Sequence, residues 1–203
     1  MKNSTIFLFL IFFYISGYSQ EYYDNGLPSE IGDYSEGLRT GEWKYYFENG
    51  QLAGIGNYSA GIRTGKWKVF YKNGQLAGKE EYSYGNKIGQ WKHYYENGQL
   101  RISGKYIKGL ETDKFKTYYP DGQLAEVGEY EKGLKIGIWK SYHITGQLKS
   151  IGNYSKGRET GLWKFYHDNE QLIQIGTYSM GEKIGEWKRY YKYGGRLKDK
   201  TNY

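Results

Sequence analysis

The chain has 203 residues, a formal net charge of +7, and 30 glycines and 25 tyrosines beside only 2 prolines and no cysteine. Aliphatic side chains are too few for a thick globular core, so the composition favours a thin repeat structure that buries aromatic rings. The absence of cysteine excludes disulfides and lipidation at a leader cysteine, and the mildly basic charge allows attraction to anionic surfaces without requiring nucleic acid.

The N-terminal segment predicts a secretory signal peptide. Lys2 is the only charged residue before an unbroken apolar run over 6–15. This layout is typical of a signal peptide, and the run is shorter than the about 20 residues that a helix needs to cross a bilayer. We therefore expect a signal peptide over 1–19, cleaved between Ser19 and Gln20, and an exported protein that is periplasmic, associated with the cell envelope or secreted. The alternative is an uncleaved anchor.

From residue 20 to residue 203 one phrase recurs with a step of 24 residues, first as GEWKYYFENGQLAGIGNYSAG over 41–61. A fixed period of this length indicates an array in which each unit stacks on its neighbours. The column of large aromatic residues is Trp43, Trp67, Trp91, Phe115, Trp139, Trp163 and Trp187.

Each unit has the pattern of a β-hairpin. Asn49-Gly50 is expected to form a type I′ turn, which requires positive φ at both central residues. The pair recurs in similar form as Asn73-Gly74, Asn97-Gly98 and Asp121-Gly122. Glu170 replaces the turn glycine in one unit, so we expect that hairpin to use a different turn.

Counting outward from a two-residue loop gives the strand register. It places Trp43 opposite Gly56, and Tyr58 opposite a second strand glycine. We therefore expect the ring of Trp43 to lie across Gly56, because a ring can cover the backbone that a glycine leaves bare. The same count places Tyr46 opposite Ala53.

A variable position lies two residues after each member of the aromatic column. It is occupied by Tyr45, Val69, His93, Thr117, Ser141, Phe165 and Arg189. A covered core would not accept Arg at such a position, so we expect no second layer over this face. The predicted fold is all-β, an elongated single-layer antiparallel meander of repeated β-hairpins with partly exposed aromatic ladders.

The phrase G-x-W-K-x-Y-Y-x-N-G-Q-L, followed by G-x-Y-x-x-G, resembles the variant MORN repeat. It is similar in particular to bacterial proteins of the YwqK family of toxin–antitoxin antitoxins. The resemblance covers about 22–197 and rests on NGQL at 49–52, 73–76 and 97–100, joined to GxWK. It implies a hairpin array that serves as a scaffold or interaction surface, with an antitoxin-like or immunity role as a special case.

The residue pattern does not predict catalysis. His143 and His167 share a column one period apart, and two strand spacings place them about 10 Å apart, too far to share a zinc ion. Acidic residues such as Glu48 and Asp121 lie at expected turns, where solvated turn chemistry explains them. No glycine-rich stretch has the spacing of a nucleotide-binding loop. We expect no enzyme, no cofactor and no metal.

A lysine follows every member of the aromatic column. These residues are Lys44, Lys68, Lys92, Lys116, Lys140, Lys164 and Lys188. Alternation along a strand puts them on the face opposite Trp43, with Tyr46 and its equivalents beside them and rungs about 10 Å apart. Such a ladder suits an anionic polymer. The alternative is that each lysine stem packs on neighbouring rings while its ammonium is solvated.

Two functions from different classes are consistent with this pattern. The first is a non-enzymatic exported scaffold that binds an unknown protein partner through Tyr45, His93, Phe165 and Arg189. Exposed aromatic surface usually marks such interaction sites. The alternative is a module that binds an anionic envelope polysaccharide or lipid headgroup through the Lys and Tyr ladders. Nucleic acid is not expected as a partner.

Overall fold

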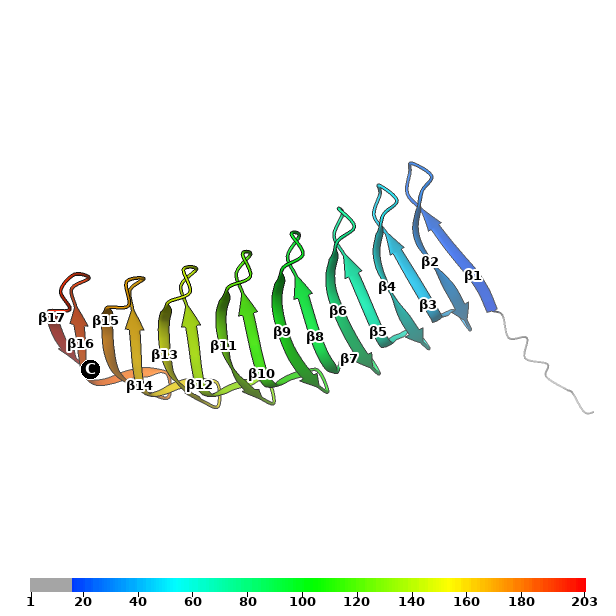
Figure 1. Cartoon of the computed structure of the whole chain (residues 1–203). Coiled ribbons are helices and arrows are strands. Elements are labelled where there is room, and N and C mark those ends of the chain that lie inside the picture. The colour runs from blue at the N-terminus through cyan, green and yellow to red at the C-terminus, as the bar shows by residue number, and fades with distance from the viewer. Residues whose placement is uncertain (1–15) are drawn as a thin grey trace, which may run out of the picture.

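The computed structural model describes residues 16–203, which form strands joined by short turns and no helix (Figure 1). The first nine strands are β1 (Ser16–Tyr22), β2 (Pro28–Ser35), β3 (Leu38–Tyr46), β4 (Leu52–Ser59), β5 (Ile62–Phe70), β6 (Leu76–Ser83), β7 (Asn86–Lys87), β8 (Gly89–Tyr94) and β9 (Leu100–Ile107). The others are β10 (Leu110–Tyr118), β11 (Leu124–Glu131), β12 (Leu134–Tyr142), β13 (Leu148–Ser155), β14 (Arg158–Tyr166), β15 (Leu172–Ser179), β16 (Glu182–Tyr190) and β17 (Leu197–Asn202). Over these residues no helix is long and apolar enough to span a membrane.

The strands form one open antiparallel sheet in which neighbours in sequence are neighbours in space. Within residues 16–203, one strand is divided into β7 and β8, which both pair with β6. Figure 1 shows the hairpins side by side in a long, gently curved row with no second layer over either face. The predicted fold class is confirmed.

The Asn-Gly turns lie along one edge of the row, and they are not type I′ turns. In the first complete repeat, the amide of Phe47 donates to the carbonyl of Gln51 and the amide of Gly50 donates to the carbonyl of Phe47, both at 2.8 Å. Gly50 has a φ of 81°, whereas Asn49 is not among the residues with positive φ. This is a three-residue loop made of a type I turn closed by a left-handed glycine. The prediction of a type I′ turn here was wrong.

The type I′ turns lie along the opposite edge. Ala60 and Gly61 have φ angles of 47° and 77°, and the flanking Ser59 and Ile62 pair with each other. Both central residues are therefore left-handed, as a two-residue I′ loop requires. The non-glycine member of this turn is Glu36, Ala60, Tyr84, Lys108, Lys132, Lys156 or Met180. Only the second position is always glycine, which is why the sequence pattern hid this turn.

The register away from the turn is nevertheless the one expected. Trp43 pairs with Gly56 and Lys44 with Ile55, but Tyr46 pairs with Leu52. Ala53, the expected partner of Tyr46, is instead an extra residue in a bulge. The loop has one residue more than we assumed, which shifts the pairing of Tyr46 by one residue. The bulge at Ala53 shifts the pairing back by one residue, so the strand partners from Tyr45 onward are those expected.

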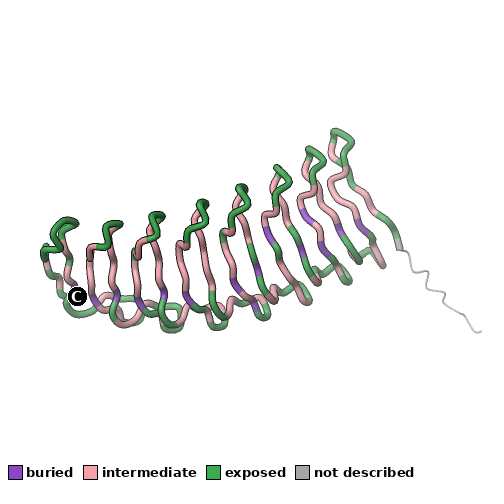
Figure 2. The backbone as a smooth tube through the Cα atoms, in the orientation of Figure 1, coloured by how far each residue is buried: buried purple, intermediate pink, exposed green. Residues whose placement is uncertain are grey.

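Tryptophans form the core, although the sheet has a single layer. The six Trp residues are only 0–5 % exposed. Figure 2 shows that buried positions recur from hairpin to hairpin along the row. A Cβ added to Gly56 would lie 2.0 Å from the ring of Trp67, and one added to Gly32 would lie 2.3 Å from Trp43. The rings thus cover the glycine of the preceding strand, except at Trp91, where Glu80 replaces that glycine. The expectation that Trp43 covers its register partner Gly56 was wrong. The expected partial exposure of the aromatic ladders holds for tyrosines such as Tyr58, whereas the tryptophans are buried.

Tyrosines connect these rings into one continuous chain of contacts. Tyr58 lies between Trp43 and Trp67, with ring centroids 6.0 and 5.2 Å away and nearly perpendicular planes. The same alternation continues from Tyr34 to Tyr203. Edge-to-face geometry is favourable because the positive ring edge meets a negative ring face. Every repeat is therefore bound to the next by its aromatic core.

A second set of contacts joins the repeats near the three-residue loops. The Tyr71 hydroxyl donates to the carbonyl of Tyr94 at 2.7 Å, and Tyr23, Tyr95 and Tyr119 make the equivalent bond. His143 occupies the same column, and its Nε2 lies 2.9 Å from the carbonyl of Tyr166. These side chains tie each loop to the following hairpin.

Glu170 was expected to change its turn and does not. Its φ is 64°, and the amide of Glu170 donates to the carbonyl of His167 as the turn glycine does elsewhere. The repeat geometry thus imposes a left-handed conformation on a residue with a Cβ, at a cost of about 1 kcal/mol.

The expected signal peptide lies mostly outside the described residues. Its proposed cleavage point, between Ser19 and Gln20, falls inside β1, where Ser19 pairs with Gly32 and Gln20 with Ile31. Cleavage there stays a prediction.

Candidate functional site

The sheet has two faces with different chemistry. We call them the Trp face, which carries the tryptophans and the variable column, and the Lys face, which carries the lysine column. Trp163 packs against Tyr154 and Tyr178 on the Trp face. Lys164 and Tyr166 line a hollow with Ile151 on the other side. The expected separation of tryptophans from the lysines that follow them is therefore correct.

The variable column lies directly beside the buried tryptophans. Phe165 stacks on Trp163 with a centroid distance of 5.8 Å. The hydroxyl of Tyr45 lies 2.9 Å from that of Tyr58, and burial followed by this hydrogen bond raises the pKa of Tyr45. Arg189 is exposed and its Nε donates to Asp199 at 2.7 Å. These side chains form the outer surface of the Trp face.

A column of mostly basic residues on the Trp face was missed in the sequence. The guanidinium of Arg39 lies 4.3 Å from the Trp43 ring centroid, and the ammonium of Lys135 lies 3.7 Å from that of Trp139. The column is Arg39, Arg63, Lys87, Glu111, Lys135, Glu159 and Lys183. Cation–π contact with buried rings explains the basic members. Their 24-residue spacing, four positions before each ring, was the available signal.

One side chain on this face breaks the repeat. Glu80 occupies the position that is glycine in the other repeats, and its side chain is only 10 % exposed. Its carboxylate accepts from the Tyr82 hydroxyl at 2.9 Å and lies 3.3 Å from His93 Nε2. Burial raises the pKa of Glu80, but the hydrogen bonds from His93 and Tyr82 outweigh it and hold the pKa below its usual range. Glu80 also lines a hollow of about 350 Å³ with Arg101.

The Lys face holds the predicted lysine column, separated by residues of the intervening strands. Lys44, Ile55 and Lys68 are in register across β3, β4 and β5. The half-buried members of the column are Lys44, Lys116, Lys140, Lys164 and Lys188. Lys68 and Lys92 are the exposed members. Half-burial agrees with the stem packing considered above, which stays a prediction, but the ammonium groups of Lys44 and Lys188 also form ion pairs with Glu42 and Glu186.

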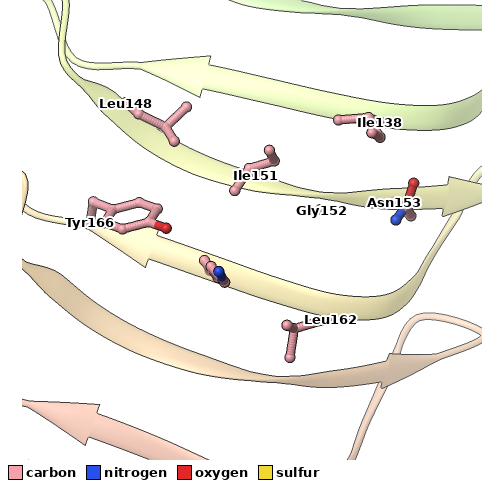
Figure 3. A pocket seen from close by; sticks show the side chains of 8 residues that line it. Ile138, Leu148, Ile151, Gly152, Asn153, Leu162 and Tyr166 are labelled. Atoms are coloured by element: carbon pink, nitrogen blue, oxygen red, sulfur yellow. The ribbon is translucent and has the colours of Figure 1, made fainter.

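Where the intervening residue is aliphatic, the Lys face is apolar between its lysines. Figure 3 shows Leu148, Ile151 and Tyr166 around a hollow of about 280 Å³, bordered by Ile138 and Leu162. The last two are more than half exposed. This surface offers packing area but no charged or nucleophilic group besides the neighbouring lysine.

The geometry gives no arrangement for metal or nucleophilic chemistry. In the part of the chain that the structure describes, no three His, Asp or Glu side chains gather as metal ligands. His143 serves a structural hydrogen bond, and His93 is held by Glu80. The surfaces instead have the form of an extended interaction scaffold.

These features define a class: a single-layer array of tandem β-hairpins with a fixed aromatic frame. The family model described as "MORN repeat variant" matches residues 39–60, 63–84, 87–108, 114–132, 135–156 and 159–180. The chain belongs to this family, whose members commonly serve as protein- or membrane-binding scaffolds and are generally not enzymes. The match concerns the repeat and does not extend to the antitoxin family.

The other comparisons add little. No curated protein matches the chain. Among 47 matching chains of solved structures is one described as "Crystal structure of GtfA/B complex bound to UDP and GlcNAc", with 21 % identity and a TM-score of 0.23. The match covers 56 % of this chain and 23 % of that chain. At this score it carries no argument about fold or function.

Proposed function

We propose that the protein is an exported, non-enzymatic scaffold that binds another protein along its Trp face. The observation that carries this proposal is the contrast between frame and surface. Tryptophan and tyrosine rings keep one geometry through the array, while the outer column changes from Tyr45 to His93, Phe165 and Arg189. A rigid frame with variable side chains suits recognition of one extended partner surface.

A capture experiment with matched variants tests this proposal. The full chain is used to capture proteins from an envelope extract at low salt, beside Tyr45→Ser with Phe165→Ser and a control, Leu162→Ser. Leu162 is 52 % exposed and lies on the Lys face. A partner retained by the control and lost with the double variant supports the proposal. Capture of nothing, or equal loss with both variants, contradicts it.

An antitoxin-like or immunity role is a special case of this proposal, suggested only by the resemblance of the repeats. Co-expression with a toxin encoded beside the gene tests it. Rescue of growth by the wild type but not by the Tyr45 and Phe165 double variant supports that role, whereas unaltered toxicity contradicts it.

The second candidate is binding of an anionic envelope polysaccharide or lipid headgroup on the Lys face. It is supported by the aligned lysines with Tyr46 and its equivalents beside them, and by the exposure of Lys68 and Lys92. Binding to envelope material should fall steeply with salt and after Lys68→Glu with Lys92→Glu. Equal binding by the charge-reversed protein contradicts this function.

A further inference from the structure

The Lys face carries one local break in its pattern, at position 79. Lys79 lies where the equivalent strands carry Ile31, Ile55, Ser103, Val127, Ile151 and Ile175. It pairs in register with Lys68 on one side and with Lys92 on the other. Three lysines therefore lie in a row across β5, β6 and β8. Like charges directly opposite each other destabilise a sheet.

Within the described residues, the acidic side chains beside this row form no ion pair with it. Over residues 16–203, ion pairs are formed neither by these three lysines nor by Lys66, which lies two positions before Lys68 on the same strand. All four side chains are exposed. Glu81 pairs in register with Lys66 without forming an ion pair, and the neighbouring Glu80 is held by His93.

A second pair of adjacent lysines shows how the chain treats such a contact elsewhere. Lys188 and Lys200 are also register partners. Between them lies Glu186, whose carboxylate is 3.2 Å from the first ammonium and 2.9 Å from the second. At the position equivalent to Glu186, the cluster around Lys79 has either Lys66 or Gln90. The repeat thus supplies an anion in one place and lacks it in the other.

The cluster borders a hollow in the Lys face. Lys66, Lys68, Lys79, Lys92 and Gln90 line it together with two carboxylates, Glu80 and Glu81, and its volume is about 550 Å³. That volume is within the usual range for small-ligand sites, about 300–1,000 Å³. The hollow at Ile151 is smaller, at about 280 Å³, and is lined mainly by aliphatic side chains.

We propose that the lysine cluster, Lys66, Lys68, Lys79 and Lys92, binds a phosphate- or sulfate-bearing anion. Each ammonium is a compact charge with three donors, and a polyvalent oxyanion can accept from several of them at once. Bound there, it relieves the repulsion between register partners, as Glu186 does in its own repeat. The inference narrows the second candidate function from the whole lysine ladder to three adjacent strands, and in that sense rests on it.

Titration calorimetry of the full chain with inorganic pyrophosphate at low salt tests the proposal. Lys79→Ile introduces the residue that neighbouring repeats carry, so the fold should persist and the thermal midpoint should rise. Pyrophosphate affinity should fall by about tenfold or more, the effect of losing one charge-assisted hydrogen bond. Lys79→Arg should retain binding. Lys140→Ala is the matched control, because Lys140 lies between Val127 and Ile151 and should leave affinity unchanged.

Each outcome decides the matter. Absence of pyrophosphate binding to the wild type, or equal affinity in Lys79→Ile, overturns the site. If Lys140→Ala lowers pyrophosphate affinity as much as Lys79→Ile does, the local site is also overturned. The second candidate function, binding along the whole lysine ladder, then remains. Phosphatidylcholine vesicles with and without phosphatidic acid identify the source of the phosphate once pyrophosphate binds. If the protein binds phosphatidic acid vesicles and this binding depends on Lys79, the anion belongs to a lipid headgroup. If the protein does not bind the vesicles, the anion belongs to a soluble or polymer-borne ester.

Discussion

At the scale of single residues, the strand glycines are the least replaceable part of the frame. Gly152 lies under the ring of Trp163, which accounts for the absence of a side chain at that position. Burying one such ring removes about 150–250 Å² from water, and at about 25 cal/mol per Å² this stabilises each repeat by roughly 4–6 kcal/mol at most. The ring reaches this burial only because the glycine lets it approach the backbone.

Gly152→Ala should therefore destabilise the protein strongly. The new Cβ would lie 2.0 Å from the Trp163 ring, and overpacking of this kind costs about 1–3 kcal/mol. Gly54→Ala is the matched control, since it is also a buried strand glycine but its nearest contact would be 3.6 Å away. Urea denaturation measures both free energies of unfolding. Equal effects at the two positions would contradict the assignment of the ring to Gly152.

Glu80 should make stability depend on pH in the acid range. Its pKa in the folded state is below the ordinary value of 4.5, so ionised Glu80 stabilises the fold above that pH. This contribution is lost as the pH falls through the lowered pKa. The free energy of unfolding of the wild type relative to Glu80→Gln should be largest above about pH 4.5 and shrink below it. A difference independent of pH would show that the contacts with His93 and Tyr82 do not favour the carboxylate.

At the scale of the hairpin, one edge of the row is held by side chains that reach into the next repeat. Tyr71 and Tyr95 donate their hydroxyls to carbonyls of the following hairpins. Phe47 occupies the same column and has no hydroxyl to donate. The first complete repeat is thus joined to the second by one hydrogen bond fewer.

Phe47→Tyr should add the missing bond, to the carbonyl of Phe70. A net hydrogen bond contributes about 0.5–1.5 kcal/mol, so the free energy of unfolding should rise by that amount. Tyr95→Phe is the reciprocal control and should lower it by a similar amount. Thermal denaturation of both variants measures the effect. If neither variant changes the free energy of unfolding, these hydrogen bonds are no more favourable than the bonds to water that they replace.

The sequence predicted most of the hairpin, and its errors have a clear cause. Period and alternation placed Trp43 opposite Gly56 and Lys44 on the other face, because strand pairing depends mainly on local spacing. The sequence did not reveal the bulge at Ala53, because no residue type in the pattern marks a bulge there. Nor could register alone show that a ring leans toward the preceding strand rather than its partner, since that direction depends on side-chain rotamers and the bulge near each Trp.

The surfaces were less predictable than the frame. The variable column and the lysine column were found from their spacing, but the burial of tryptophan in a single layer was not. That burial depends on neighbouring side chains that cover the rings, such as Arg39 over Trp43 and Phe165 over Trp163. The cluster around Lys79 needs the register of three strands at once. The 24-residue period in the sequence shows Lys68 and Lys92. It does not show that Lys79, on the strand between them, pairs with both.

At the scale of the whole molecule, stability and function both depend on an open array. Each hairpin contacts mainly its two neighbours, so no central core closes the structure and both faces stay accessible along the row (Figure 2). Because β7 and β8 share one position, the row has 16 strand positions about 4.8 Å apart and is about 72 Å long.

Small-angle X-ray scattering of the purified, monomeric protein tests this central claim most directly. A row of that length and about one strand length wide should give a radius of gyration of about 23 Å, whereas a compact globule of similar chain length gives about 16 Å. A value near 23 Å with a rod-like distance distribution is the expected result. A value near 16 Å would mean that the sheet closes on itself, and would remove the exposed faces on which both proposed functions depend.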